Sequence, residues 1–84
     1  MKVFTIRDNK AEYYYPPQFY RNAAEATRAC ENAVNQQADT LFAKNAEDFS
    51  LFQIADWNET TAKIEIEDKK HIADLIDLRV PLEE

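Results

Sequence analysis

Glycine is absent from this 84-residue sequence, whereas it makes up about 7% of an average protein. Loops that cradle nucleotide phosphates need glycine wherever the backbone approaches the phosphate group closely. The absence of glycine therefore excludes phosphate-binding loops of this kind. Turns must form instead at asparagine, aspartate and proline. Such residues occur at Asp8-Asn9, Pro16-Pro17, Asn35, Asn45 and Asn58.

Cysteine and histidine each occur only once. With Cys30 alone, neither an internal disulfide nor a cysteine-based zinc site can form, and its apolar neighbours indicate a buried, inert thiol. His71 and Asp74 share one face of an expected helix, but two ligands do not make a metal site. Ser50 lies in no nucleophile-elbow pattern. We therefore expect no catalytic residue, no metal and no cofactor.

No hydrophobic run approaches the length of a membrane span, and the apolar run near the first residue is too short for a signal peptide. We expect a protein of the cytoplasm, without membrane contact. A chain of this length fits a single domain over residues 1–84 with one modest core. Such a core supports a binding surface better than a deep catalytic cleft.

Alternating apolar residues predict the strands. Two such runs flank a polar turn within residues 49–67 and predict a β-hairpin. Its second arm alternates Ile64 and Ile66 with charged residues, so we expect these two isoleucines on a buried face. Residues 2–7 predict another strand, and residues 11–15 an edge strand that ends at Pro16-Pro17 because proline donates no ladder hydrogen bond.

A helix is predicted over roughly residues 23–35. Asn22 and Glu25 have the spacing of a capping box, and apolar residues recur at three- and four-residue spacing as Ala26, Ala29, Cys30, Ala33 and Val34. Residues 37–44 predict a further turn or two of helix, and Asp68 is a candidate cap for a final helix that ends before Pro81. The expected fold class is α+β: a small antiparallel sheet of about three strands packed against one main helix, with a short C-terminal helix.

The net charge of −6 is unevenly distributed along the chain. Residues 1–30 contain five basic and three acidic residues, and residues 31–84 contain five basic and thirteen acidic ones. The first part interleaves aromatic and basic side chains, a combination that stacks on exposed bases and neutralises phosphates. Alternatively, alternate tyrosines pack on the core and the others cover a sheet edge. The candidate DNA-binding residues are Arg7, Lys10, Tyr13, Tyr15, Tyr20, Arg21 and Arg28.

Five short motifs follow in order over residues 2–67: Asp8-Asn9-Lys10-Ala11, Pro16-Pro17-Gln18-Phe19, Glu25-Ala26-Thr27-Arg28-Ala29, Glu47-Asp48-Phe49-Ser50-Leu51-Phe52 and Asp56-Trp57-Asn58-Glu59-Thr60. In this order they resemble the small nonstructural protein of gokushoviruses, which are single-stranded-DNA phages of the microvirus group. The resemblance implies a role in viral DNA replication or packaging, commonly with DNA binding, and brings no catalytic motif. That family usually has glycine at the positions of Ala24, Ala55 and Ala62, and proline at Ala46.

These observations favour a non-enzymatic phage accessory protein that binds single-stranded DNA in the cytoplasm of the infected bacterium. The alternative is a protein–protein adaptor whose acidic second half docks on a viral or host replication protein. A small core with aromatic residues near exposed strand edges also predicts a homo-oligomer, most simply a two-fold dimer.

Overall fold

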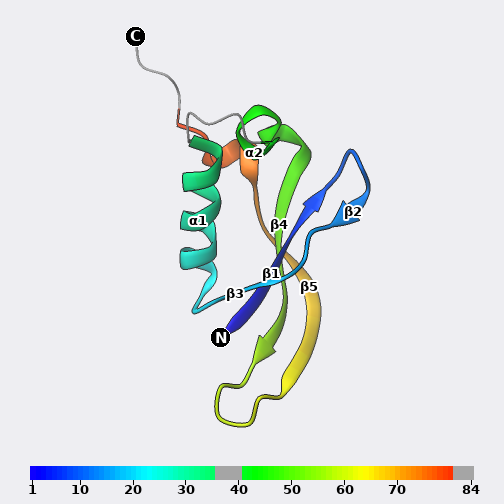
Figure 1. The fold of residues 1–84 in the computed structure, drawn as a ribbon, viewed down its shortest axis with the longest axis vertical. Helices are drawn as coiled ribbons and strands as arrows, with labels where there is room; N and C mark the ends of the chain where they lie inside the picture. The colour runs from blue at the N-terminus through cyan, green and yellow to red at the C-terminus, as the bar shows by residue number, and fades with distance from the viewer. Residues whose placement is uncertain (36–40, 81–84) are drawn as a thin grey trace.

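The computed structural model describes residues 1–35 and 41–80 of the chain. Within these residues an antiparallel sheet of five strands packs against the main helix (Figure 1). Of the short helix predicted at residues 37–44, residues 41–44 are helical, and residues 37–40 lie outside the described part of the chain. The elements are β1 (Lys2–Asp8), β2 (Tyr13–Tyr14), β3 (Gln18–Tyr20), α1 (Ala23–Asn35), α2 (Leu41–Lys44), β4 (Phe49–Trp57) and β5 (Ile64–Asp74), with 3-10 helices at Ala46–Asp48 and Leu75–Leu78.

The strand order is β2-β1-β4-β5. β2 and β3 pair with the same edge of β1, β2 near the end of β1 and β3 near its start. The α+β class and the antiparallel sheet are thus confirmed, with five strands instead of about three. The strand that the sequence did not predict is β3, and it arises because Pro16-Pro17 interrupts the returning segment. The chain pairs with β1 before the two prolines as β2 and again after them as β3.

The predicted helix beginning at Asp68 is wrong over its first half. β5 continues to Asp74, and only the 3-10 helix Leu75–Leu78 follows it. The nine residues of β4 explain the difference, because their outer backbone groups would lack partners if β5 ended at residue 67. Pairing of Leu51 with Ala73 and of Ser50 with Asp74 completes that ladder. Tertiary pairing therefore overrides the local helical pattern.

The expectation that Ile64 and Ile66 are buried is also wrong. Ile66 is 85% exposed and Ile64 is 54% exposed. Both lie on the face of the sheet that α1 does not cover, where Ile64 pairs across the strands with Trp57 of β4 and Ile66 with Ala55. Figure 1 shows that the β4–β5 hairpin also extends past the first turn of α1.

The core lies between α1 and the other face of the sheet. Ala26, Cys30 and Val34 of α1 are buried there, whereas Ala29 and Ala33, the other two residues of the predicted stripe, are half-buried. The predicted Asn22 cap is confirmed, since the Glu25 N–H donates to Asn22 Oδ1 at 2.9 Å, whereas Glu25 Oε1 reaches one residue further back and accepts the N–H of Arg21 at 3.1 Å. From the sheet and its flanks the core receives Phe4, Ala46, Phe49, Leu51 and Leu75.

The close contact of α1 with the sheet predicts an asymmetric response to larger side chains. Ala26→Leu should lower the free energy of unfolding by about 1–3 kcal/mol, because Ala26 is fully buried and the added carbons would displace the side chains packed around it. Ala24→Leu is the matched control, since Ala24 is exposed on the same helix. Urea denaturation followed by circular dichroism measures both. Equal stability of the two variants would contradict this packing.

The turn between β4 and β5 contains a strained residue. Ala62 has φ 63°, in the left-handed region that favours glycine, and this is one of the positions where the resembling family has glycine. Ala62→Gly should therefore leave stability unchanged or raise it by up to about 1 kcal/mol. Ala24→Gly, within α1, should lower stability by about 0.5–1 kcal/mol. Thermal melts of the two variants compare them, and a larger loss at Ala62 would refute the assigned strain.

Candidate nucleic-acid interface

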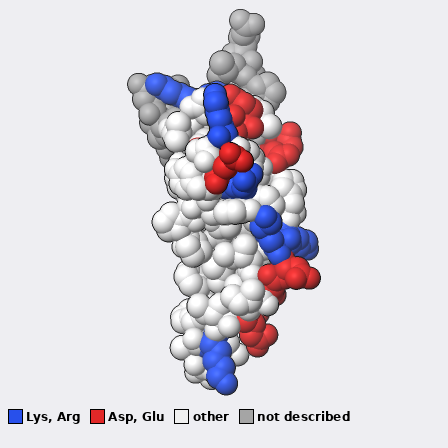
Figure 2. All heavy atoms as spheres, turned by 90° about the vertical axis from the view of Figure 1, so that its right-hand side faces the viewer, with Lys and Arg blue, Asp and Glu red and all other residues white. Residues whose placement is uncertain are grey.

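The face of the sheet opposite α1 is largely apolar. Val3, Thr5 and Ala55 point to this side and are buried, although the helix lies on the other one. Larger neighbouring side chains shield them: the ring of Phe19 packs edge-on against Trp57, with centroids 5.6 Å apart. Figure 2 shows this side of the molecule, where a broad uncharged area is bordered by charges along one margin and at the ends.

Three aromatic rings from three strands form a row across this face. The Tyr14 ring contacts that of Phe52 with centroids 6.1 Å apart, and Phe52 contacts His71 at 5.5 Å. Lys69 lies over the row, with Nζ 5.0 Å from the centroids of both Tyr14 and Phe52, and donates a hydrogen bond to the Tyr14 hydroxyl. The guanidinium carbon of Arg7 lies 5.5 Å from the Tyr14 centroid. We call these five residues the aromatic–cationic cluster.

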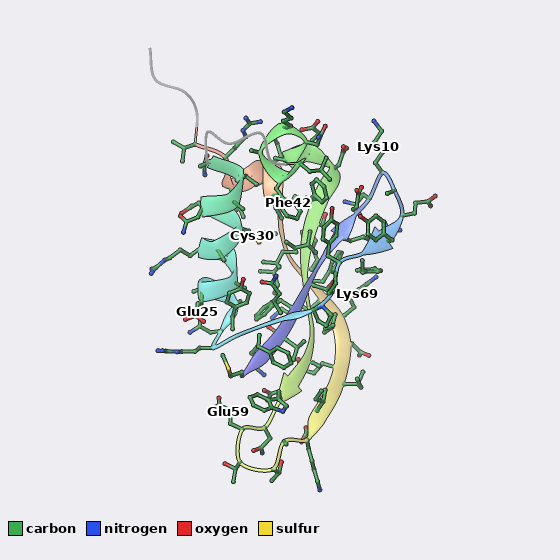
Figure 3. All side chains as sticks on the ribbon, in the orientation of Figure 1. Lys10, Glu25, Cys30, Phe42, Glu59 and Lys69 are labelled. Carbon is green, nitrogen blue, oxygen red and sulfur yellow. The ribbon has the colours of Figure 1, made fainter. Side chains whose placement is uncertain are left out.

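The aromatic–cationic cluster borders an open recess of about 520 Å³. Its lining brings together apolar surface, two aromatic rings and one ammonium group, and Figure 3 shows Lys69 at this side of the sheet. A flat ring with an attached anion matches these features, because rings stack on aromatic side chains and lysine neutralises phosphate. The lining residues are Thr5, Tyr14, Tyr15, Pro17, Ile54 and Lys69.

The structure separates the tyrosines of the predicted DNA-binding site. Tyr15 is half-buried between Phe42 and Phe49, with ring centroids 5.4 and 6.0 Å away. Tyr13 stacks on Tyr15 at 5.3 Å and 15°. Tyr20 packs against the core through Phe4 and donates its hydroxyl proton to Gln18. Tyr15 and Tyr20 therefore pack on the core, which is the alternative that the sequence left open.

The basic residues of the predicted site are separated as well. Arg7 belongs to the aromatic–cationic cluster, and Lys10 lies exposed in the β1–β2 turn at one end of the sheet (Figure 3). Arg21 precedes α1 and lies 3.9 Å from Glu25, and Arg28 is exposed on α1 itself. Tyr14, Phe52, Lys69 and His71 were missed, because only the sheet register brings them to Arg7.

Comparison with known families gives one result. A model described as "Phage ORF5 protein" matches residues 1–78. The chain belongs to the phage ORF5 protein family. The match spans all five strands and α1, so it covers the whole described sheet. No curated protein and no solved structure matches the chain. A phage protein family is therefore confirmed, while a gokushovirus origin and a replication role stay predictions.

This phage ORF5 family protein contains one serine–carboxylate–imidazole group. Ser50 donates a hydrogen bond to Asp74 Oδ1 at 2.8 Å, and His71 Nε2 lies 2.9 Å from the same oxygen. These bonds, first from His71 and then from Ser50, lower the pKa of Asp74. The carboxylate stands between serine and imidazole, whereas a serine nucleophile needs the imidazole as its own neighbour. The hydrogen bond from Ser50 to Asp74 therefore joins β4 to β5 and does not activate the serine.

Over residues 1–35 and 41–80, no three histidine, cysteine, aspartate or glutamate side chains are grouped so that they could hold a metal ion. No helix within the same ranges has the length and apolar character needed to cross a membrane.

Cys30 lines a second cavity of this family member, of about 180 Å³, between α1 and the sheet. The lining is mostly apolar and includes Phe4, Phe42 and Leu51. Burial raises the pKa of the Cys30 thiol to about 11, so the thiol is protonated at neutral pH. A thiolate is the reactive form of cysteine, and Cys30 is therefore inert.

We expect slow reaction of Cys30 with Ellman's reagent at pH 8 in the folded protein and fast reaction in concentrated urea. A pKa of about 11 leaves only about one thiolate in a thousand at that pH, and the side chain is buried as well. The control carries Cys30→Ala and Ala24→Cys, which moves the thiol to an exposed position on α1. Equal rates for the two folded proteins would show that Cys30 is accessible.

Proposed function

We propose that this phage protein binds single-stranded DNA on the uncovered face of its sheet, as a non-enzymatic accessory protein in viral genome replication or packaging. The observation that carries the proposal is the aromatic–cationic cluster beside the open recess. Membership of a phage protein family and the resemblance to gokushovirus nonstructural proteins support the biological setting, the cytoplasm of the infected bacterium.

The cluster has the parts that single-strand binding needs. Tyr14 is 40% exposed and can stack on a base, while Lys69 and Arg7 stand beside it to contact phosphates. Contact with the Tyr14 ring holds both cations in place before DNA arrives, which lowers the entropic cost of binding. Bases of a duplex are stacked on each other, so this surface favours single strands.

The acidic residues behind the net charge of −6 do not all lie on this face, and two of those in the sheet lie beside Lys2 on its other side. Lys2 Nζ lies 3.5 Å from both Asp56 Oδ2 and Glu67 Oε2. These three residues lie on the side of the sheet that carries α1, since Lys2 alternates with Val3 along β1. Arg7, Lys69 and the more distant Lys10 therefore supply a local positive field.

A second candidate function is docking on a protein, such as a viral or host replication protein. The observation that favours it is the apolar end of the same face, where Phe19 and Ile64 are about half exposed and Ile66 almost fully. The acidic residues Glu59 and Glu65 lie exposed nearby in the hairpin and would suit a basic partner.

The proposal predicts which substitutions weaken DNA binding. Tyr14→Ala should cost about 1–3 kcal/mol, a rise in Kd of about 5- to 150-fold, because one stacking platform is lost. Lys69→Ala should weaken binding and lower the salt slope by about 0.7, the value for one phosphate contact on a single strand. Fluorescence anisotropy with a labelled single-stranded oligonucleotide at several salt concentrations measures both effects.

Arg28→Ala is the matched control, because it removes a cation from the exposed surface of α1 and leaves the cluster intact. Its Kd should equal that of the unchanged protein. Weaker binding by Arg28→Ala together with unchanged binding by Tyr14→Ala would move the interface to the helical side. Absence of any binding at low salt would reject DNA as the ligand and favour the protein partner.

A further inference from the structure

β5 is a long strand at the edge of the sheet. Seven of its eleven residues pair with residues of β4 on one side, and no strand among residues 1–35 and 41–80 pairs with the other side. The opposite edge of the sheet differs, because it consists of the short strands β2 and β3 with Pro16-Pro17 between them. Short, proline-interrupted edges resist pairing with other chains, whereas a long edge offers a row of backbone groups.

The charges along β5 are ordered by sign. Glu65, Glu67 and Asp68 come first, and Lys69 and Lys70 follow. An antiparallel second copy of the strand reverses this order, so that the acidic half of each strand lies opposite the basic half of the other. A parallel copy in register would instead place each charge beside its equal, which is destabilising.

We propose that β5 pairs antiparallel with β5 of a second copy of this chain, about a two-fold axis between residues 68 and 69, and so forms a homodimer. In this register Asp68 lies opposite Lys69 of the second copy, and Glu67 lies opposite Lys70. The two-fold symmetry repeats both pairs, which gives four oppositely charged contacts in a short ladder.

The two faces of the sheet agree with this register. Glu67 and Lys70 both neighbour Gln53 of β4, Glu67 through a hydrogen bond of 3.0 Å and Lys70 as its cross-strand partner. Ile66 and His71 lie on the other face, opposite Ala55 and Phe52. Two of the three pairs across the proposed ladder therefore join side chains of the same face: Glu67 with Lys70, and the 85% exposed Ile66 with His71 of the second copy.

The middle of β5 also has the fewest pairs with β4. Gln53 pairs with Lys70 and Ala55 with Ile66, so residues 67–69 lie opposite the single residue Ile54. Three residues opposite one cannot all complete a regular ladder. Pairing with another strand would satisfy backbone groups of this segment.

The proposed dimer is closed. Its two sheets form one continuous sheet, with both copies of α1 on one side and both recesses on the other, and the remaining edges are the short strands β2 and β3. No third copy can add through β5. The inference does not rest on DNA binding, and its test contains no DNA.

Size-exclusion chromatography with light scattering at tens of micromolar protein tests the dimer. The chain mass is 9.8 kDa, and we expect twice this value. Reversal of the basic half (Lys69→Glu with Lys70→Glu) and of the acidic half (Glu67→Lys with Asp68→Lys) should each give a monomer. An equal mixture of the two variants should restore the dimer, because residues 67–70 are then all acidic in one chain and all basic in the other.

The control reverses two exposed charges on α1, Arg28→Glu with Glu31→Lys, and should remain a dimer. Circular dichroism melts check that each variant folds, and restoration in the mixture shows folding independently. A mass of 9.8 kDa for the unchanged protein would overturn the proposal. A dimer that survives both reversals but is lost in Phe19→Ala would place the interface on the apolar face instead, and a mixture that stays monomeric would overturn the register.

Discussion

The structure depends on the close packing of one short helix against one face of the sheet. Ala26 and Cys30 allow the 13-residue helix α1 to approach Phe4 and Leu51, and the two 3-10 helices add Ala46 and Leu75 to the same core. Within the described residues no other element of comparable length exists to cover the opposite face. The sheet must therefore protect its second face with its own side chains, and this need shapes the rest of the molecule.

Small side chains next to the backbone and large ones around them meet that need. Val3, Thr5 and Ala55 are buried on the uncovered face, while Tyr14 and Trp57 belong to the surrounding aromatic groups. Large rings that shield a sheet keep their own outer surfaces in contact with water. The same rings attract cations through their π-systems. A surface suited to stacking and phosphate contact thus follows from how a small sheet is covered, which is why the proposed function and the fold are linked.

The sequence predicted what is local and missed what depends on register. The Asn22–Glu25 cap and the apolar spacing of α1 act within a few residues, so they were found. The tyrosine run also alternates as a strand does, but which tyrosines face the core is decided only when β2 pairs with β1. Tyr15 turned inward and Tyr14 outward, where it meets Lys69, 55 residues further along the chain. No local pattern contains such a contact.

The error over residues 68–74 has a physical origin of its own. A strand at a sheet edge benefits from charged side chains, above all lysine, because they discourage unwanted pairing. The same charges, set among a few apolar residues, also resemble the wet side of an amphipathic helix. In β5 the ambiguity is resolved by β4, whose backbone needs a partner. The charges then act on what approaches the outer edge: their order opposes parallel stacking of many copies, whereas in the proposed antiparallel arrangement the charges of residues 67–70 meet their opposites.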